Sequence, residues 1–556
     1  MKLQKLFLLF ICLFMGEQLY SQDIENVFNR DAILQRRPLK FSGNLSANIT
    51  HIHSKPPDSR PPLTYQLNGT LNTTIFESFS IPVTVNLNNY GSNVQYPQLP
   101  NRLALHPKYK WVQTHIGDVS MTFGPYTLNG HQFTGVGVEL TPNRWHIAAM
   151  GGRLLRRVDL DTSSTAPQPN YERWGYGLKT RYDANRFAIG ATFFAAQDRA
   201  NPIMFEFDSL TIFPQSNIAT SIEGKAKIIN NLELSAEYAL SILQRDVRIA
   251  FRNYYHALTG SISYTFWGNT IGAKYERISP EYKTLGAYYF NNDYENITLN
   301  YSRKLFTNTL SIALSGGIQR DDLYNVRAEK TIRFVGSANM EWTPNDRLTA
   351  SLDASSFNSH RNMKSNFDYI NEQTPYDNLD TLEFTQISNS FNLGVNYKLF
   401  KNEKQTHTMS FTACLNEAAD RHDAYIIPGN LTRFVNSSTA YNMQLSATSI
   451  VLAVNMSNHY SQRKNSLTWG PSLNVTQHLF KNALNIGMSV SYNQTYIEKL
   501  ITANIYNTRL NVGYKFFKKH NLTAILNYQF RRLREGDTPE YHALISQLSY
   551  SYSFGD

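Results

Sequence analysis

The chain has 556 residues and a formal net charge of +10; 42% of its residues are hydrophobic, 13% are aromatic and 17% are charged. The positive charge is modest for this length, and no basic cluster with interleaved aromatic residues stands out. The composition therefore argues against nucleic-acid binding.

The first residues, MKLQKLFLLFICLFMGEQLYSQ, have the layout of a secretory signal peptide. Lys2 and Lys5 precede an unbroken apolar run from Leu6 to Met15, and the small residue Ser21 stands at the expected cleavage point. The apolar run is about half of the ~20 residues that a membrane-spanning helix needs. We therefore predict that residues 1–21 are a signal peptide and that the chain is exported.

Cysteine usage agrees with an exported chain that has neither disulfides nor Cys-rich zinc sites. Cys12 lies inside the apolar run, so we interpret it as part of the signal and not as a lipid-anchored residue. After cleavage Cys414 is the one cysteine left. It can form no intramolecular disulfide, and a zinc site of the Cys-rich kind is excluded.

Strand patterns begin at about Leu39, and the Pro-rich stretch SKPPDSRPPL (54–63) reads as a loop because proline cannot donate to a strand ladder. His51 and His53 fall on one face of the first strand, roughly 7 Å apart at the strand rise. No third ligand accompanies them, so we predict no metal site.

The stretch GGRLLRRVDLD (151–161) mixes Arg and Asp side chains, which could line an ion-selective lumen or form a charged rim.

Strict alternation of apolar and polar residues follows along the chain. In FNLGVNYKLF (391–400) and LNVGYKFF (510–517) one face carries apolar residues, and the other carries Asn, Gly and Lys. Between such strands lie short turns with an adjacent aromatic residue, at 267–269, 307–308, 343–346, 401–404, 481–482 and 518–521. Longer polar segments, at 359–380, 418–432, 494–501 and 532–540, separate the hairpins.

No stretch after residue 22 is apolar enough for a membrane helix, but closed barrels of alternating strands also cross membranes. Short turns at one end, longer loops at the other, and aromatic residues beside the turns are typical of outer-membrane β-barrels. On this basis the polar residues Asn392, Asn396, Lys398, Asn511 and Lys515 are predicted to line the pore. The acidic loop 366–383 has no EF-hand spacing, so we interpret it as a solvated loop.

The last strand, QLSYSYSFGD, places Tyr552 and Phe554 near the C-terminus. It resembles the C-terminal signal by which the barrel assembly machinery recognises outer-membrane barrels. It departs from that signal in having Ser where Gly is usual and two residues after the last aromatic residue. An ordinary aromatic edge strand is the alternative interpretation.

These patterns predict an all-β fold, a transmembrane antiparallel β-barrel with short periplasmic turns and longer extracellular loops. The succession of short turns gives about 26 strands, but the alternation of short turns and longer loops fails near 114–135 and near 276–296. One strand lost at each place leaves about 24, within an even range of 22–26. The expected organisation is a signal peptide (1–21), a short periplasmic segment (22–37) and the barrel (38–556), with 114–135 as a candidate inward-folded constriction.

Three stretches, IGDVSMTFGPYTLNGHQFTGVGVEL, YERWGYGLKTRY and YERISPEYKTLGAYYFNND, together with the signal peptide and the barrel tail, carry a resemblance. The chain resembles large outer-membrane β-barrel proteins of the Bacteroidota, porin-like or secretion-associated. The resemblance implies outer-membrane residence and a role in transport or secretion. It supplies no catalytic or binding residues for this sequence.

The sequence contains no HExxH, no GxSxG and no phosphate loop, so we expect no enzyme activity and no cofactor. The expected function is a conduit or channel scaffold for solutes or a polypeptide, with an internal stopper or a secretion or surface-protein partner. One alternative is a TonB-dependent-like surface receptor lacking a large plug. Another is an exported soluble β-protein.

Overall fold

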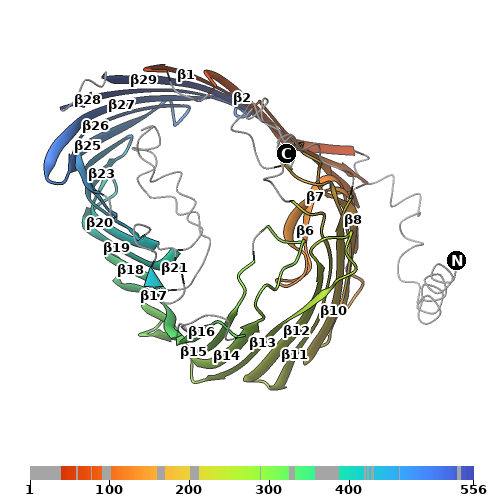
Figure 1. Ribbon diagram of the computed structural model, residues 1–556. Coiled ribbons are helices and arrows are strands. Elements are labelled where there is room, and N and C mark those ends of the chain that lie inside the picture. The colour runs from red at the N-terminus through yellow and green to blue at the C-terminus, as the bar shows by residue number, and fades with distance from the viewer. Residues whose placement is uncertain are drawn as a thin grey trace.

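The computed structural model describes residues 39–555 except 58–60, 77, 90–101, 160–168, 201–211, 289, 325–331, 357–386, 419–420, 423–424, 427–430, 462–463 and 535–539 (Figure 1). The predicted signal peptide and the segment 22–37 lie outside these residues. Within the described ranges, no helix has the length and apolar character needed to span a membrane.

Strands follow one another along the whole described chain. The first half contains β1 (Leu39–Lys55), β2 (Leu63–Ile75), β3 (Phe79–Asn88), β4 (Arg102–Leu105), β5 (Lys108–Tyr109), β6 (Val112–Thr122), β7 (Asn129–Leu140), β8 (Trp145–Leu155), β9 (Arg173–Asp183), β10 (Phe187–Asp198), β11 (Ser216–Ile229), β12 (Leu232–Gln244), β13 (Asn253–Phe266) and β14 (Asn269–Ile278).

The second half continues with the same hairpin connectivity. It contains β15 (Tyr294–Leu305), β16 (Leu310–Asp321), β17 (Ile332–Asn345), β18 (Leu348–Ser355), β19 (Ile387–Lys401), β20 (Gln405–Ala418), β21 (Arg421–His422), β22 (Tyr425–Ile426), β23 (Thr432–Leu445), β24 (Thr448–Ser461), β25 (Asn465–Leu479), β26 (Leu484–Ile497), β27 (Leu500–Phe516), β28 (His520–Leu533) and β29 (Tyr541–Phe554). The short strands β21 and β22 pair only with each other.

The sheet closes on itself because β29 pairs antiparallel with β1, from Gly43↔Phe554 to Lys55↔His542. It contains 27 strands. The short strands β4 and β5 both pair with β3 and β6, so they share one position in the wall. The fold is therefore a closed antiparallel barrel of 26 strands, within the expected range but above the expected number of about 24.

The two strands subtracted in the sequence prediction are both present. The region 114–135 contains β6 and β7, joined at 123–128, and the region 276–296 contains the end of β14 and the start of β15. In both places the connecting segment folds into the barrel, as Figure 1 shows for the chain between β14 and β15. The expected alternation of short turns and longer loops failed at these places because the connections do not project away from the wall.

The repeated aromatic turn motif forms left-handed turns. Phe306, Thr307 and Asn308 have φ values of 51°, 56° and 72°, and Phe480, Lys481 and Asn482 repeat them at 51°, 55° and 70°. Such turns match the twist of paired strands. The corresponding rings project outward, with Phe480 74% exposed. The turn at 401–404 differs, because the Asn402 side chain accepts the backbone N–H groups of Lys404 and Gln405.

One expected loop is not a loop. The segment 494–501 was predicted as a longer polar connection, but β26 and β27 pair up to Ile497↔Leu500. Glu498 and Lys499, at φ 47° and 72°, make a two-residue turn. The polar residues of this stretch belong to the strands. The predicted loop 359–380 lies outside the described residues.

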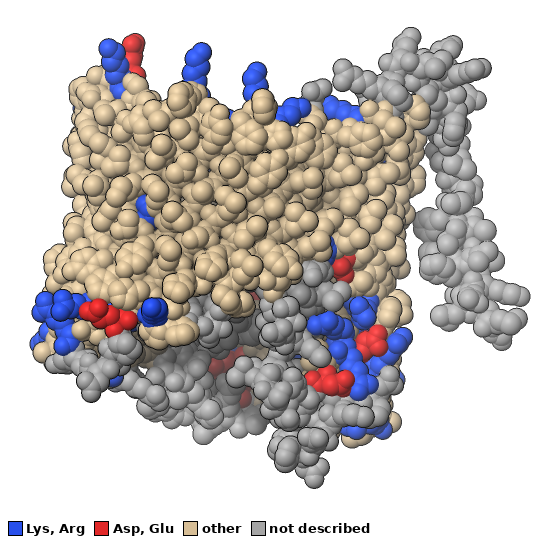
Figure 2. All heavy atoms as spheres, turned by 90° about the horizontal axis from the view of Figure 1, so that it is seen from above, with Lys and Arg blue, Asp and Glu red and all other residues tan. Residues whose placement is uncertain are grey.

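The outer surface of the wall is apolar. Along β11, Ser221 is 4% exposed and the adjacent Ile222 is 62% exposed, which is the alternation of a strand with two different faces. Many large apolar side chains on other strands are exposed in the same way, among them Leu299 on β15 and Leu452 on β24. Figure 2 shows Lys, Arg, Asp and Glu gathered mainly at the two rims, with a broad band of other residues between them.

Candidate functional site in the barrel lumen

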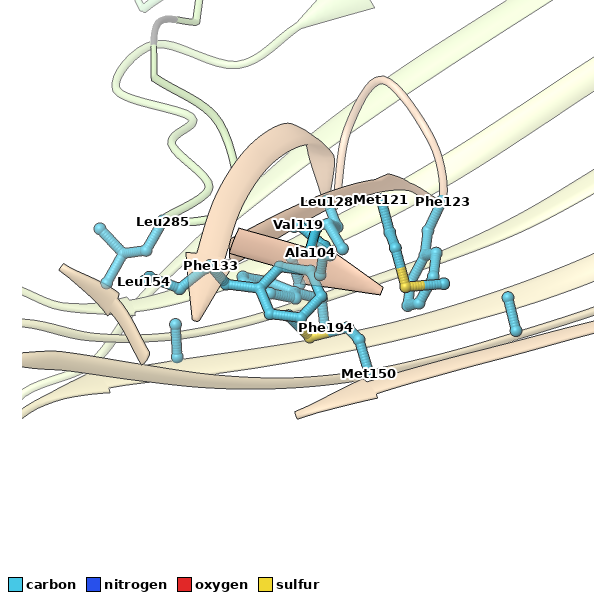
Figure 3. Packing of buried hydrophobic residues seen from close by; sticks show 13 residues of the cluster. Ala104, Val119, Met121, Phe123, Leu128, Phe133, Met150, Leu154, Phe194 and Leu285 are labelled. Carbon is cyan, nitrogen blue, oxygen red and sulfur yellow. The ribbon is translucent and has the colours of Figure 1, made fainter. Parts of the chain in front are cut away.

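The strand β6 leaves the wall at Gly117. It pairs with β4 only at Ala104↔Gly117 and Leu105↔Ile116. Gly117 has a φ of 102°, and a Cβ at this position would lie 2.2 Å from the carbonyl oxygen of Leu103. Only glycine adopts this backbone so close to a neighbouring strand. After Gly117 the chain bends into the barrel, where Val119 and Met121 are buried in an apolar cluster (Figure 3).

The inward-bent strands β6 and β7 end in the hairpin 123–128, which is almost completely buried. Phe123, Tyr126 and Leu128 are 1%, 3% and 0% exposed. Phe123 N donates to the Leu128 carbonyl oxygen at 2.8 Å, which closes the hairpin. The hairpin is also tied to the wall, because Lys179 Nζ donates to the Phe123 carbonyl oxygen and Tyr126 Oη donates to Glu276 Oε1 at 2.9 Å.

The segment 279–288, which follows β14, packs on this hairpin, and the two together are called the luminal insert here. Tyr282 Oη donates to the Tyr126 carbonyl oxygen at 2.8 Å, and Thr284 Oγ1 donates to the Thr127 carbonyl oxygen at 2.6 Å. Asn129 N donates to the Gly286 carbonyl oxygen at 2.9 Å. Residues separated by more than 150 positions therefore form one unit within the barrel.

The wall also holds the segment 279–288 directly. Ser241 Oγ donates to the Lys283 carbonyl oxygen at 2.6 Å, and the Asn217 side chain accepts the Leu285 N–H at 3.2 Å. Burial raises the pKa of Tyr126 and of Tyr282, so both phenols stay protonated and donate at ordinary pH. Burial lowers the pKa of Lys283.

Small residues on the inner wall leave room for the luminal insert. Ala196, Ala219 and Ala239 are at most 3% exposed and lie in the two apolar clusters that include insert residues. At Gly177 on β9, a Cβ would lie 2.6 Å from Cε2 of Phe123. Because protein interiors are close-packed, larger side chains at these positions would displace the insert.

Charged side chains lie on β9 and β11 between the insert and the end of the barrel with the short turns. Lys179, which binds the hairpin, is 3.8 Å from Glu223. Arg181 is 3.1 Å from the same carboxylate and 2.9 Å from Asp183. These contacts fix the charges in one network, so this part of the lumen carries fixed charges of both signs.

The five residues predicted to line the pore lie on strands distant from the insert. Asn392, Asn396 and Lys398 are on β19, whereas Asn511 and Lys515 are on β27. Their sequence neighbours Phe391, Tyr397, Leu510 and Tyr514 are exposed apolar or aromatic residues. Because adjacent strand residues point to opposite faces, this placement fits a lumen position for the polar set. Pore lining by these residues stays a prediction.

The residues of the predicted assembly signal lie at the closing seam. Tyr552 pairs with Leu45 and Phe554 with Gly43 across β1 and β29. The Tyr552 ring stacks on His520 with ring centroids 4.5 Å apart. Recognition by the assembly machinery stays a prediction.

In the described residues the other sequence motifs form no second site. His51 and His53 pair with β29 and are exposed, and no group of three metal-ligating side chains occurs in the part of the chain that the structure describes. Arg157 pairs with Asp159 at 2.7 Å beyond the end of β8. The acidic loop 366–383 lies outside the described residues.

Two features of the sequence pointed to the insert: the irregular alternation of turns and loops, which marked 114–135 as a candidate constriction, and the resemblance. The three stretches that carry the resemblance, 116–140, 171–182 and 275–293, contain the inward-bent hairpin, the strand β9 beneath it and the segment that packs on it. Lys179 joins the second stretch to the first, and Thr284 joins the third to the first. Gly177 on β9 was a further signal, because it faces the space that Phe123 fills.

Comparisons with known proteins identify no relative. No protein-family model and no curated protein matches the chain. Among solved structures, the P pilus usher (PapC) translocation pore is 11% identical, covers 93% of this chain and 99% of its own, and has a TM-score of 0.38. The FrpB iron transporter from Neisseria meningitidis is 10% identical over 94% and 83%, with a TM-score of 0.38. OccAB2 of Acinetobacter baumannii is 9% identical over 92% and 98%, with a TM-score of 0.32.

Proposed function

We propose that the protein is an outer-membrane channel scaffold whose lumen is narrowed by the luminal insert. The observation that carries this proposal is the closed wall with an apolar outer band and charges gathered mainly at its rims. A closed barrel leaves no unpaired strand edge, which is the condition for β-structure in a bilayer. Most wall strands exceed the roughly 9–11 residues that a tilted transmembrane strand needs.

The luminal insert supports a conduit with a built-in constriction. Barrels of more than 20 strands enclose a wide lumen, and the known large ones carry a plug. Here the hairpin 123–128 and the segment 279–288 occupy part of that space and are fixed to the wall by hydrogen bonds. Solutes or a polypeptide would pass beside the insert and over the charged network of Lys179, Arg181 and Glu223.

The membrane part of the proposal is tested by cell fractionation and by gel mobility. The protein should be recovered with the outer membrane, and its band should shift between unheated and boiled SDS samples. Recovery as a soluble periplasmic protein would favour the alternative of an exported soluble β-protein. Strong loss of outer-membrane protein on depletion of the barrel assembly machinery would support that partner.

The channel part is tested in planar bilayers. The intact protein should show a small conductance, and deletion of Val119 to Gly130 should produce a much larger one, because it removes the hairpin 123–128, the end of β6 from Val119 and the first two residues of β7. The deletion variant must retain its heat-dependent gel shift. Intact protein that already conducts as a wide open pore, with no change on deletion, would contradict the constriction.

A TonB-dependent-like receptor lacking a large plug remains the second candidate, because the insert could close the lumen until a ligand binds. Outer-membrane lipid and a secretion or surface-protein partner belong to the proposal, as does the Bacteroidota resemblance. Enzyme activity, nucleic-acid binding and cofactors form no part of it.

A further inference from the structure

A polar pocket lies where β6 separates from the wall. It has a volume of about 420 Å³. It is lined by residues of β1, β2, β3 and β4 and by His106 on one side, and by Asp118, Val119 and Ser120 of β6 on the other. Gly117 creates the space by directing β6 away from β4. The volume lies in the range of small-molecule sites in proteins.

The wall side of the pocket consists of two cross-strand rows on one face of the sheet. Asn44 pairs with Thr70, and Thr70 pairs with Thr84. Asn68 pairs with Asn86, which pairs with Arg102. The alternate positions on the same strands, such as Leu45, Leu67 and Leu103, are exposed apolar residues of the outer surface. The pocket therefore faces the lumen.

Two opposite charges border the pocket without pairing with each other. Asp118 accepts Thr134 Oγ1 at 2.6 Å and the Leu103 N–H at 3.2 Å, so its carboxylate is held in place. Both of these partners are neutral, and a carboxylate retains lone pairs for a further donor. Arg102 forms no ion pair with Asp118 within 4.0 Å, and the structure gives it no other carboxylate partner in the residues that it describes.

We propose that this pocket binds a small zwitterionic solute, a free amino acid or a dipeptide. Its carboxylate would bind the Arg102 guanidinium, which suits planar carboxylates, and its ammonium group would bind Asp118. The Asn44, Asn68 and Asn86 side chains offer donors and acceptors for a peptide group between them. Among the lining residues the one ring is the imidazole of His106, whose Nδ1 lies 2.7 Å from Nδ1 of His115.

The experiment measures binding of a labelled dipeptide, alanyl-alanine, to the mature protein in detergent by equilibrium dialysis. The matched control ligand is the same dipeptide with an acetylated N-terminus and an amidated C-terminus, which keeps the peptide group and removes both charges. The zwitterion should bind saturably, and the blocked form should bind at least about tenfold more weakly, because hydrogen bonds between charged groups are the strong ones. Equal binding of both forms, or none by the zwitterion up to roughly 10 mM, would overturn the proposal.

Variants locate the site. Arg102→Gln and Asp118→Asn should each weaken dipeptide binding by about tenfold or more, whereas Arg144→Gln, on an exposed turn at the other end of the barrel, should bind like wild type. Wild-type affinity in both pocket variants would place the solute elsewhere. The heat-dependent gel shift checks that each variant is folded. If a variant is not folded, the comparison of the zwitterionic and the blocked dipeptide on wild-type protein still tests the proposal. Dipeptide binding is measured without ionic current. The binding proposal can therefore fail while the channel proposal stands, and the channel proposal can fail while the binding proposal stands.

Discussion

Gly286 is the position at which a single methyl group would separate the two parts of the luminal insert. A Cβ there would lie 2.7 Å from the Thr127 carbonyl oxygen, 2.9 Å from Cε1 of Phe194 and 3.0 Å from Cα of Leu128. Two of these contacts are to backbone atoms of the hairpin, which cannot rotate away as a flexible side chain can. Gly286→Ala should therefore push the segment 279–288 away from the hairpin.

The magnitude follows from the packing around this position. Overpacking a well-filled interior costs about 1–3 kcal/mol. Two hydrogen bonds join the two parts of the insert and a third joins Asn129 of β7 to Gly286, and each contributes about 0.5–1.5 kcal/mol. At about 1.4 kcal/mol per tenfold change, the substitution should raise the population of separated insert by roughly 5- to 150-fold.

Single-channel recording in planar bilayers measures this population directly. Gly286→Ala should show more frequent excursions to a higher conductance level than wild type. The matched control is Gly224→Ala on β11, where a Cβ would meet nothing within 4 Å. If folded Gly286→Ala records like Gly224→Ala, the insert does not govern the conductance and the reasoning is wrong.

Three further predictions concern the membrane face, assembly and pH. An arginine at a lipid-facing midplane site costs roughly 2–4 kcal/mol, so Val395→Arg should lower refolding yield in lipid more than Asn396→Arg; equal yields would reject the face assignment. Replacing Tyr552 and Phe554 together by Ser should sharply lower outer-membrane levels, and unchanged levels would mean that this strand is not the assembly signal. Hydrogen bonds from Arg245 and Tyr255 lower the pKa of Glu281. The stabilisation from Glu281 is therefore present above its unfolded-state pKa of about 4.3 and is lost as the pH falls through the folded value. Excursions to the higher conductance level should become more frequent below about pH 4, and Glu281→Gln should reduce this effect of acid. If Glu281→Gln responds to acid like wild type, other groups cause the effect.

Local patterns in the sequence predicted the barrel because its strands and turns are specified by neighbouring residues. The motif at 305–310 recurs at 479–484, and both copies form the same left-handed turn. The sequence could not distinguish a two-residue turn at 498–499 from a longer polar loop, because lumen-facing residues such as Asn493 are as polar as loop residues.

The sequence indicated only part of the luminal insert. It marked 114–135 as a candidate constriction, but the packing of the segment 279–288 on this hairpin could not be predicted. A strand that bends into the barrel keeps the same alternation as one that stays in the wall, so β6 shows no change of pattern at Gly117. The contacts that define the insert join Tyr126 to Tyr282 and Thr127 to Thr284. Such pairings depend on the closed wall bringing β7 and β14 to the same space, and no local pattern specifies them.

The composition of the insert determines how it can act. Phe123, Leu128 and Leu285 are at most 1% exposed, and burying a large apolar side chain contributes about 1.5–3 kcal/mol. Full detachment would therefore cost roughly 5–9 kcal/mol for these three side chains alone, before the hydrogen bonds are counted. That cost exceeds the 1–3 kcal/mol expected for Gly286→Ala, which is why the substitution should give brief excursions and only deletion a lasting open level. A ligand or partner that opens the lumen by moving the insert must supply this free energy as a difference in affinity between the two states. In the proposed channel the insert without such a partner is a fixed constriction, and solutes would pass beside it.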